Sequence, residues 1–481
     1  MYRTPSKRRQ RLKLIGIYTL MTLGVGLLVT FLVFIMLGYR FNRDTSSIEQ
    51  GGLVQFASRP IDATVTIGKA KLGDLTPSKI TVNSGNYTVR MNKNGYKEWS
   101  KNVDVRAGEV LWLNYAQLVP NDIRTDSLTE FSALSSVKSS PNGDRFALIG
   151  DPARPVVTFV DVTGNESRST ELSIPAGLLP EGKTPSFAIS DWANDSDRLL
   201  ITMAYDSTVE RLVVDRRDAD RTVNLTKTYE ADIAEAIFDP RSSERVITRS
   251  SKGDVRIIDT ADKSLSGVAA TSVTSMSLYG SDALLLVQSV ADGSQTVGYL
   301  SLGSEKVRVL KRIASADRTL VALSKYFSEP YVAISTGSQL EVFKLKSLPS
   351  SESDAPLSMS TVLSTTLPAT VDYLSIRSGG RFVVAQYGGG VQTYDLELDK
   401  QTLTAFKTPV SGELRWLDKY HFYVTTGTGL EVMEFDGGNA HVVADLTTQF
   451  DAVQSDDGRF IYSINATDKG FALQRSRMIV E

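Results

Sequence analysis

The sequence predicts a mainly β protein that starts with a transmembrane helix and continues as a small antiparallel β-sandwich and a larger, repeated β-domain. Three observations predict this fold class: an uncharged apolar run near the N-terminus, a block of short alternating segments, and a recurring phrase of polar turn, Arg and apolar strand. A chain of 481 residues is expected to hold two or three domains. We expect a basic cytoplasmic tail at 1–13, the helix at 14–38, a linker at 39–51, the sandwich at 52–119 and the repeated domain at 120–481.

The first element is the run at 14–38, which contains no charged side chain. A helix of this length spans about 37 Å, enough to cross a hydrocarbon core of roughly 30 Å. A cleaved signal peptide has a shorter apolar core of about 7–15 residues, so an uncleaved anchor in the lipid bilayer is expected. Thr22, Gly26 and Thr30 form a row of small residues that could pair two helices weakly. Small residues scattered over a lipid-facing helix are the favoured alternative.

The charges that flank this run predict its orientation. Six basic residues precede it, whereas only Arg40 and Arg43 follow it closely. The positive-inside rule therefore places the N-terminus in the cytoplasm and residues 41–481 outside, as an extracellular or periplasmic part of a single-pass protein. That part has 46 basic and 55 acidic residues, a net charge of −9. It shows no basic patch with interleaved aromatic residues, so nucleic acid is not expected as a partner.

The second element is the block of short strands between residues 52 and 119. Apolar and polar residues alternate at 64–67, 87–91, 103–105 and 110–113, and Gly, Asn or Pro bounds each run, as in an antiparallel sandwich. The block resembles the PEGA domain family in Ser58, Pro60–Ala63, Val65, Ile67, Gly68, Gly73, Thr76, Pro77, Gly85, Tyr87, Val89, Gly95, Tyr96 and the alternation up to Leu118. The signature itself reads Pro-Ile-Asp-Ala here instead of Pro-Glu-Gly-Ala. The resemblance implies a non-enzymatic module of the cell envelope and implies no ligand.

The third element is the recurring phrase, seen for example at 142–150, 194–205, 379–397 and 457–475. Each unit contains a turn, an apolar strand, a Gly-containing turn and another strand. Successive units lie about 40–50 residues apart, the period of a four-stranded propeller blade. Eight units predict a β-propeller of eight blades, with seven as the alternative. The rhythm resembles that of WD-type and Tol-type propellers, but no family-defining motif accompanies it.

The same pattern predicts how the propeller closes. The apolar strand after the turn is expected to be an inner strand, covered on both faces by neighbouring blades. The last unit ends at Glu481 and is one strand short, so residues 122–134 are expected to complete it and leave no bare edge. Residues 346–370 are rich in Ser, Thr and Pro, and we expect a long inter-strand loop there. Such a loop is expected to be a flexible insertion. The alternative is a binding loop.

Most of the conspicuous polar residues have a structural interpretation. Recurring turn pairs such as Asn142-Gly143 and Asp457-Gly458 suit tight turns, and the repeated arginines are expected to pack on turns and blade surfaces. These arginines are Arg145, Arg198, Arg381 and Arg459. The acids at 194–197 and 215–220 are expected to be solvated turn residues and not a metal site. Trp192 and Trp416 are placed near blade starts, and His421 within a strand.

No residue is singled out as catalytic, cofactor-binding or metal-binding, and no cofactor is expected. The chain has no cysteine and only two histidines, His421 and His441, and it lacks the common zinc-protease and serine-hydrolase motifs. The predicted function is a surface-displayed, non-catalytic scaffold of the bacterial envelope that binds a protein or glycan on the outer side. One alternative is a glycan hydrolase with paired carboxylates, because sequence cannot place two acids at catalytic separation. The other is a structural subunit of a membrane complex.

Overall fold

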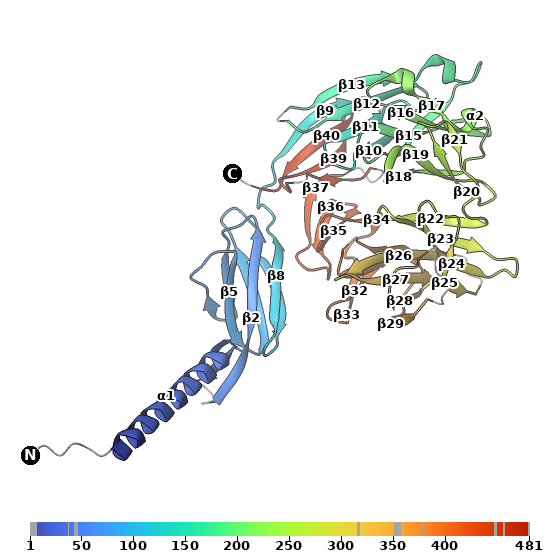
Figure 1. The fold of residues 1–481 in the computed structure, drawn as a ribbon. Coiled ribbons are helices and arrows are strands. Elements are labelled where there is room, and N and C mark those ends of the chain that lie inside the picture. The colour runs from blue at the N-terminus through green and yellow to red at the C-terminus, as the bar shows by residue number, and fades with distance from the viewer. Residues whose placement is uncertain are drawn as a thin grey trace, which may run out of the picture. The chain divides into compact units, whose positions relative to one another are not determined.

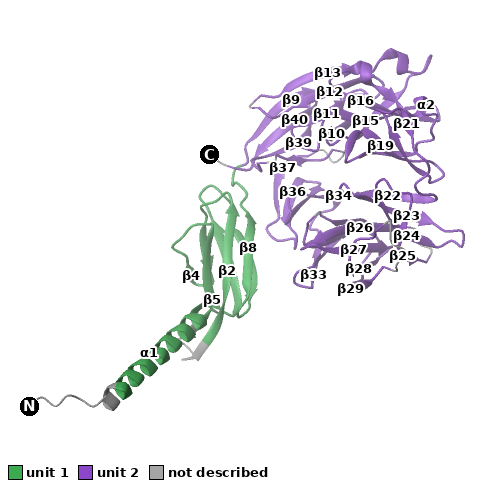
Figure 2. Ribbon diagram, viewed as in Figure 1, with its two compact units in different colours: residues 1–122 green, residues 123–481 purple. Residues whose placement is uncertain are grey.

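The computed structural model describes residues 7–36, 38–42, 47–164, 166–314, 318–350, 357–377, 379–446, 450–455 and 457–479. The chain divides into two compact units, Met1–Asp122 and Ile123–Glu481, coloured separately in Figure 2. The second unit therefore begins a few residues after the expected boundary at 120.

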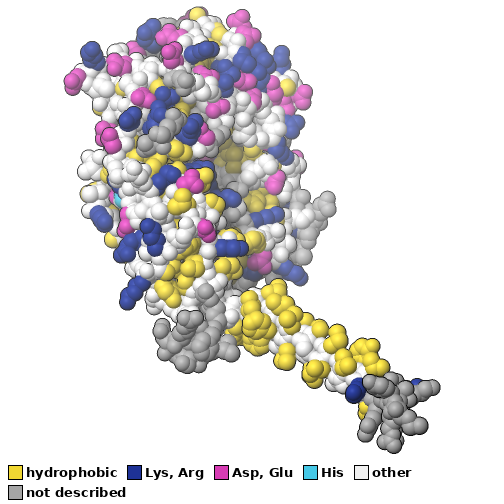
Figure 3. All heavy atoms as spheres, turned by 90° about the vertical axis from the view of Figure 1, so that its left-hand side faces the viewer, with side chains coloured by type: hydrophobic (Ala, Val, Ile, Leu, Met, Phe, Trp, Pro, Cys, Tyr) yellow, Lys and Arg dark blue, Asp and Glu magenta, His cyan; other side chains and the backbone are white. Residues whose placement is uncertain are grey.

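The first unit begins with helix α1, Lys7–Met36. Its segment Arg11–Met36 is long and apolar enough to cross a membrane, and none of its strongly apolar window is buried. Figure 3 shows hydrophobic side chains along this helix. The helix stops before Gly38, whose φ of 79° lies outside the helical region. Thr22 and Thr30 donate their hydroxyl groups to backbone carbonyls one turn earlier, so these polar groups are satisfied within the helix. Helix-mediated self-association stays a prediction.

Two four-stranded sheets form the sandwich of the first unit (Figure 1). One contains β1 (Tyr39–Asn42), β2 (Ser47–Arg59), β5 (Ser78–Asn83) and β8 (Val110–Gln117), and the other contains β3 (Thr64–Ile67), β4 (Ala70–Lys71), β6 (Gly85–Asn92) and β7 (Trp99–Val105). The alternation found in the sequence is the alternation of burial: Val65 and Ile67 are buried, as are Trp99 and Leu113. These side chains belong to one hydrophobic core.

The structure differs from the sequence-based expectation at two places in this unit. The expected linker at 39–51 is wrong where it is described, because β1 and β2 pair there, with Tyr39 opposite Gln50. Its polar composition suited a linker, but β2 continues to Arg59 and pairs with β5 and β8, so the hairpin extends a larger sheet. The sandwich is also not purely antiparallel, since β2 and β8 run parallel. These two strands are far apart in sequence, so no tight turn fixes their relative direction.

The second unit is a β-propeller, and its described residues contain eight four-stranded sheets, the number that the repeat pattern favoured over seven. In chain order, sheet 1 holds β10 (Ser136–Ser139), β11 (Arg145–Ile149), β12 (Val156–Asp161) and β13 (Arg168–Ser173); sheet 2 holds β14 (Ser186–Trp192), β15 (Arg198–Tyr205), β16 (Thr208–Asp215) and β17 (Val223–Asn224), followed by helix α2 (Leu225–Thr228); sheet 3 holds β18 (Glu235–Asp239), β19 (Ser242–Arg249), β20 (Val255–Asp259) and β21 (Ser264–Leu265); and sheet 4 holds β22 (Val273–Tyr279), β23 (Ala283–Ser289), β24 (Gln295–Ser301) and β25 (Arg308–Ile313).

The remaining four sheets follow the same order. Sheet 5 holds β26 (Thr319–Tyr326), β27 (Glu329–Thr336), β28 (Gln339–Leu345) and β29 (Met359–Thr366); sheet 6 holds β30 (Val371–Ile376), β31 (Phe382–Tyr387), β32 (Gly390–Asp395) and β33 (Lys400–Ala405); sheet 7 holds β34 (Val410–Trp416), β35 (His421–Thr426), β36 (Gly429–Glu434) and β37 (His441–Ala444); and sheet 8 holds β38 (Val453–Gln454), β39 (Phe460–Thr467), β40 (Gly470–Arg477) and β9 (Thr125–Phe131).

The recurring apolar strand is the second strand of its sheet. Strand β31 is entirely buried, and β11, β15 and β39 each contain a continuous run of four buried residues, as expected for strands covered on both faces. They are not the innermost strands, however. The first strands of consecutive sheets contact one another, as β10 and β14 do, so those strands line the centre of the ring. The sequence phrase therefore identifies the core of each sheet and misses its inner edge.

The predicted closure of the ring is confirmed. Strand β9 pairs antiparallel with β40, placing Phe131 opposite Phe471 and Thr125 opposite Ser476. Sheet 8 thus combines the first strand of this unit with its last three. A shared hydrophobic core joins sheet 8 to sheet 1 through residues such as Leu148, Val160 and Ile464.

The expected long loop at 346–370 is wrong in part, because β29 occupies Met359–Thr366. This strand is the outermost of sheet 5, paired only with β28. An outermost strand needs few apolar side chains, and here Leu363 is its buried residue. Its Ser/Thr-rich sequence therefore lacks the pattern by which a central strand is recognised. Residues 351–356 of the expected loop lie outside the described residues.

Candidate functional site

Three of the four repeated arginines form cross-strand ion pairs. Arg145, Arg198 and Arg381 each lie at or just before the start of the second strand of their sheet and pair with an acid where the third strand ends. The Arg145 Nε lies 3.2 Å from Asp161, and the Arg198 Nε lies 3.5 Å from Asp215. Arg381 binds both carboxylate oxygens of Asp395. These three arginines therefore have the expected role in turn and blade packing. The sequence analysis did not predict their acidic partners.

The acids at 194–197 and 215–220 are not simply solvated. The carboxylate of Asp215 is only 1% exposed and contacts Arg198, Arg217 and Arg221. Burial alone would raise the pKa of Asp215, but hydrogen bonds from Arg217 and the charges of Arg217 and Arg221 outweigh it and lower the pKa to about 2. The expectation of solvated acids is therefore wrong for Asp215, because arginines replace the water that would otherwise surround the carboxylate.

Two aromatic residues and a histidine serve the packing between sheets and turns. The Trp192 indole donates to the carbonyl of Lys138 at 3.2 Å, and the Trp416 indole donates to Ser375 at the same distance. Both bonds join the innermost strand of one sheet to that of the preceding sheet. His421 is buried at the start of β35, as expected for a strand residue, and its Nδ1 lies 2.9 Å from the Asp418 carboxylate. His441 lies at the start of β37.

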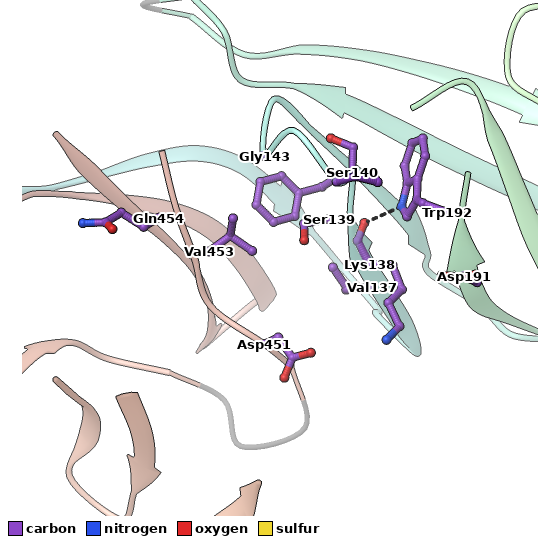
Figure 4. A pocket seen from close by; sticks show the side chains of 12 residues that line it. Val137, Lys138, Ser139, Ser140, Gly143, Asp191, Trp192, Asp451, Val453 and Gln454 are labelled. Atoms are coloured by element: carbon purple, nitrogen blue, oxygen red, sulfur yellow. Dashed lines mark hydrogen bonds between the residues drawn. The ribbon is translucent and has the colours of Figure 1, made fainter. Parts of the chain in front are cut away.

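A pocket of about 360 Å³ lies beside the innermost strands of sheets 1, 2 and 8. Figure 4 shows Lys138 between Asp191 on one side and Asp451 on the other. The Trp192 bond to Lys138 described above braces one wall. The remaining lining residues include Ser139, Ser140, Phe146, Val453 and Gln454. This pocket, with one cation between two carboxylates, is the candidate functional site.

The two carboxylates of this pocket differ in their surroundings. Asp191 Oδ2 accepts the backbone N–H of Phe238 at 3.0 Å. Burial raises the pKa of Asp191, although the N–H groups of Phe238 and Trp192 and the charge of Lys138 oppose this rise. Asp451 is exposed and lies 3.5 Å from Arg415 Nε, which keeps a positive charge near its carboxylate. The pocket therefore contains one carboxyl group with a raised pKa and a second carboxylate that pairs with an arginine.

No motif in the sequence marks Lys138, Asp191 or Asp451. Lys138 and Asp191 lie in strands of different sheets and Asp451 lies just before β38, so the three residues are far apart in the sequence. The polar alternation of the innermost strands, such as Ser190-Asp191 in β14, is the pattern that could have marked them. Among the residues that the structure describes, no three acids or histidines gather as a metal site would require.

Residues 52–120 match the model of the PEGA domain. This match confirms the resemblance, and its end differs by one residue from the expected sandwich at 52–119. Together with the propeller and the apolar N-terminal helix, this domain suggests a surface-binding or scaffold role. A PEGA domain suggests an extracellular position for this part of the chain.

Comparison with solved structures finds propellers of low sequence identity. The β-propeller domain of Cps50 (Swd1) from Myceliophteria thermophila is 13% identical, with a TM-score of 0.41 over 66% of this chain and 98% of that one. An oligogalacturonate lyase in complex with manganese is 12% identical, with a TM-score of 0.42 over 74% and 98%. Dihydro-heme d1 dehydrogenase NirN, in complex with DHE, is 10% identical, with a TM-score of 0.45 over 64% and 65%. No curated protein matches the chain. No activity passes from these structures to this chain.

Proposed function

We propose that this chain is a single-pass protein of the bacterial cell envelope that displays its propeller outside the cell and binds a protein or glycan there without transforming it. Helix α1 is the uncleaved anchor, its N-terminus is cytoplasmic, and residues 41–481 are extracellular or periplasmic. The observation that carries the proposal is the order of the parts. An exposed apolar helix leads directly into a PEGA domain and then into a propeller.

The propeller suits binding because its sheets form a rigid frame on which loops and pockets are held. The recurring Arg–Asp pairs and the strand β9 stabilise that frame. The pocket around Lys138 presents charges of both signs within about 360 Å³. A small polar part of a larger ligand fits such a site.

A glycan hydrolase is the second candidate, and the environment of Asp191 favours it. A general acid needs a raised pKa, and a second carboxylate must stay ionised. Asp191 has the raised pKa, and Asp451 is a second carboxylate in the same pocket. Under this alternative, Asp191 would donate a proton to a glycosidic oxygen.

One experiment separates the two candidates. The full chain in lipid nanodiscs is incubated with polysaccharides and proteins purified from bacterial envelopes, and both co-sedimentation and new reducing ends are measured. Binding without new reducing ends supports the proposal. Reducing ends that disappear in Asp191→Asn and Asp451→Asn would support the hydrolase. Absence of both binding and product would contradict both candidates.

The topology is tested on intact cells. Added protease should remove the part of the chain beyond residue 41 and leave the N-terminal tail, detected by an epitope tag on Met1. Full protection of the chain in intact cells, with cleavage only after lysis, would contradict the outward orientation.

A further inference from the structure

A second, larger hollow lies between sheets 8 and 1 and contains three arginines. Its volume is about 660 Å³. Arg459 comes from the turn before β39, and Arg475 and Arg477 come from β40. Phe460 and Tyr462 of β39 form its apolar wall. We call these five residues the arginine crevice.

The arginine crevice is where sheet 8 departs from the pattern of sheets 1, 2 and 6, whose repeated arginine pairs with an acid. In sheet 6, Arg381 precedes Phe382, and Phe382 lies opposite Asp395. Arg381 Nε donates to the carboxylate of Asp395 at 2.6 Å. In sheet 8, Arg459 precedes Phe460 in the same way, but the residue opposite Phe460 is Arg477. A cation thus occupies the position that holds the neutralising acid in sheet 6.

The guanidinium groups of the crevice are arranged around one ring. Arg475 lies 4.7 Å from the centroid of Phe460, and Arg477 lies 5.7 Å from it. Arg475 also contacts the half-exposed Asp126 at 3.3 Å. Among the residues that the structure describes, no carboxylate lies within ion-pair distance of Arg477. Its backbone N–H donates to the carbonyl of Arg124, which fixes the strand that carries it.

The other charges at this hollow belong to turns. Asp144 accepts a hydrogen bond from Asn142 at 3.0 Å, and Asp457 accepts from the hydroxyl of Ser455 and from the backbone of Arg459. Both acids therefore already shape the turns in which they lie. With three arginines and these two acids lining it, the hollow retains a net positive charge.

We propose that the arginine crevice binds an acidic peptide segment of a protein partner. A carboxylate of the partner pairs with Arg477 in the way that Asp395 pairs with Arg381 in sheet 6. The inference rests on the proposed binding function and names the chemistry of its partner. Guanidinium groups bind carboxylates with charge-assisted hydrogen bonds and often with two at once.

The aromatic side chains favour a peptide over an acidic glycan. A sugar ring is usually held by an open aromatic face, but Phe460 already has two guanidinium groups over its ring. Tyr462 is 4% exposed, and its hydroxyl donates to the carbonyl of Val162 at 3.3 Å. Phe460 is therefore already engaged by cations, and Tyr462 is too buried to stack on a sugar.

The test uses the full chain in lipid nanodiscs and a fluorescent hexaglutamate peptide, with binding measured by anisotropy. Hexaglutamine and an oligomeric uronate are the comparison probes. Arg477→Asp recreates the acid of sheet 6, so it should weaken hexaglutamate binding by about tenfold or more and leave the melting temperature unchanged or raised. Arg312→Asp, an exposed arginine of sheet 4, makes the same change of charge far from the crevice and should leave binding unchanged.

The possible outcomes separate this inference from the proposed function. If hexaglutamate does not bind, or binds equally well to Arg477→Asp, the crevice assignment is wrong even when envelope material still binds the chain. Tighter, Arg477-dependent binding of the uronate would make an acidic glycan the ligand and overturn the peptide. If Arg477→Asp fails to fold, Arg477→Gln replaces it, and unchanged binding by that variant again contradicts the assignment.

Discussion

Asp215 offers the sharpest test of how the propeller is stabilised. Its carboxylate is 1% exposed and Arg198, which it contacts, is 6% exposed. Replacement of Asp215 with Asn removes the negative charge but keeps the shape of the side chain. Arg198 would then rely on Glu244, its other carboxylate partner. We expect this variant to fold and to be less stable, because a buried cation loses part of its compensation.

The pKa of Asp215 sets the size of the expected loss of stability. A shift from the usual 3.8 to about 2 corresponds to about 2.5 kcal/mol of stability at neutral pH. For a domain of this size, that free energy lowers the melting temperature by about 3–4 °C. Differential scanning calorimetry of the full chain in detergent, with and without the substitution, measures this difference.

The pH dependence has a definite sign. The pKa of Asp215 is lower in the folded state than in the unfolded state, so its stabilisation is present above about pH 4 and is lost as the pH falls towards about 2. The difference in melting temperature between the wild type and Asp215→Asn should therefore shrink to about half at pH 3. Above pH 5 it should be constant.

Sheet 1 supplies the matched control. Asp161 occupies the same position as Asp215, but its side chain is 32% exposed and that of its partner Arg145 is 25% exposed. Since solvent screens this pair, Asp161→Asn should cost at most about 1 kcal/mol. Equal losses in the two variants would refute the reasoning, as would a loss in Asp215→Asn that does not change between pH 7 and pH 3.

Two further predictions concern the frame of the propeller. A fragment that starts at Ser135 lacks β9 and leaves an edge of β40 unpaired. It should aggregate, or melt several degrees below a fragment that starts at Pro120. Equal solubility and equal melting temperatures would show that β9 does not close the ring. The hairpin between β26 and β27 turns through Phe327 and Ser328, which both have positive φ, and Phe327 is 81% exposed. Asn suits this conformation better than Phe, so Phe327→Asn should raise the free energy of unfolding by about 0.5–1 kcal/mol in calorimetry, and a decrease would contradict the assigned strain.

The sequence predicted the elements whose surroundings impose a repeating pattern. The apolar segment of helix α1 is not buried in the protein, and its continuous apolar composition made the helix recognisable. The second strand of each sheet is covered on both faces and therefore reads as a continuous apolar run, as in Phe146–Ile149. Strand β9 was found by a different argument, because the last unit needed a partner for its edge.

The elements that the sequence missed lie at the two edges of the sheets. Innermost strands such as β10 carry half-buried polar residues, and outermost strands such as β29 are largely exposed. Neither position demands an apolar run. The candidate pocket was missed for the same reason, because Lys138 and Asp191 lie on innermost strands and meet Asp451 only when the ring closes.

The repeated arginine also has different surroundings in different sheets. Where the third strand ends in an acid, as in Asp161 or Asp395, the arginine is consumed in holding its own sheet together. In sheet 8, Arg477 stands where the acid would be. Strand β9, which joins the beginning of the propeller to its end, completes this sheet. The sheet that closes the ring is therefore the one in which Arg477 replaces the acid, and this departure from the repeat marks the surface at which we expect binding.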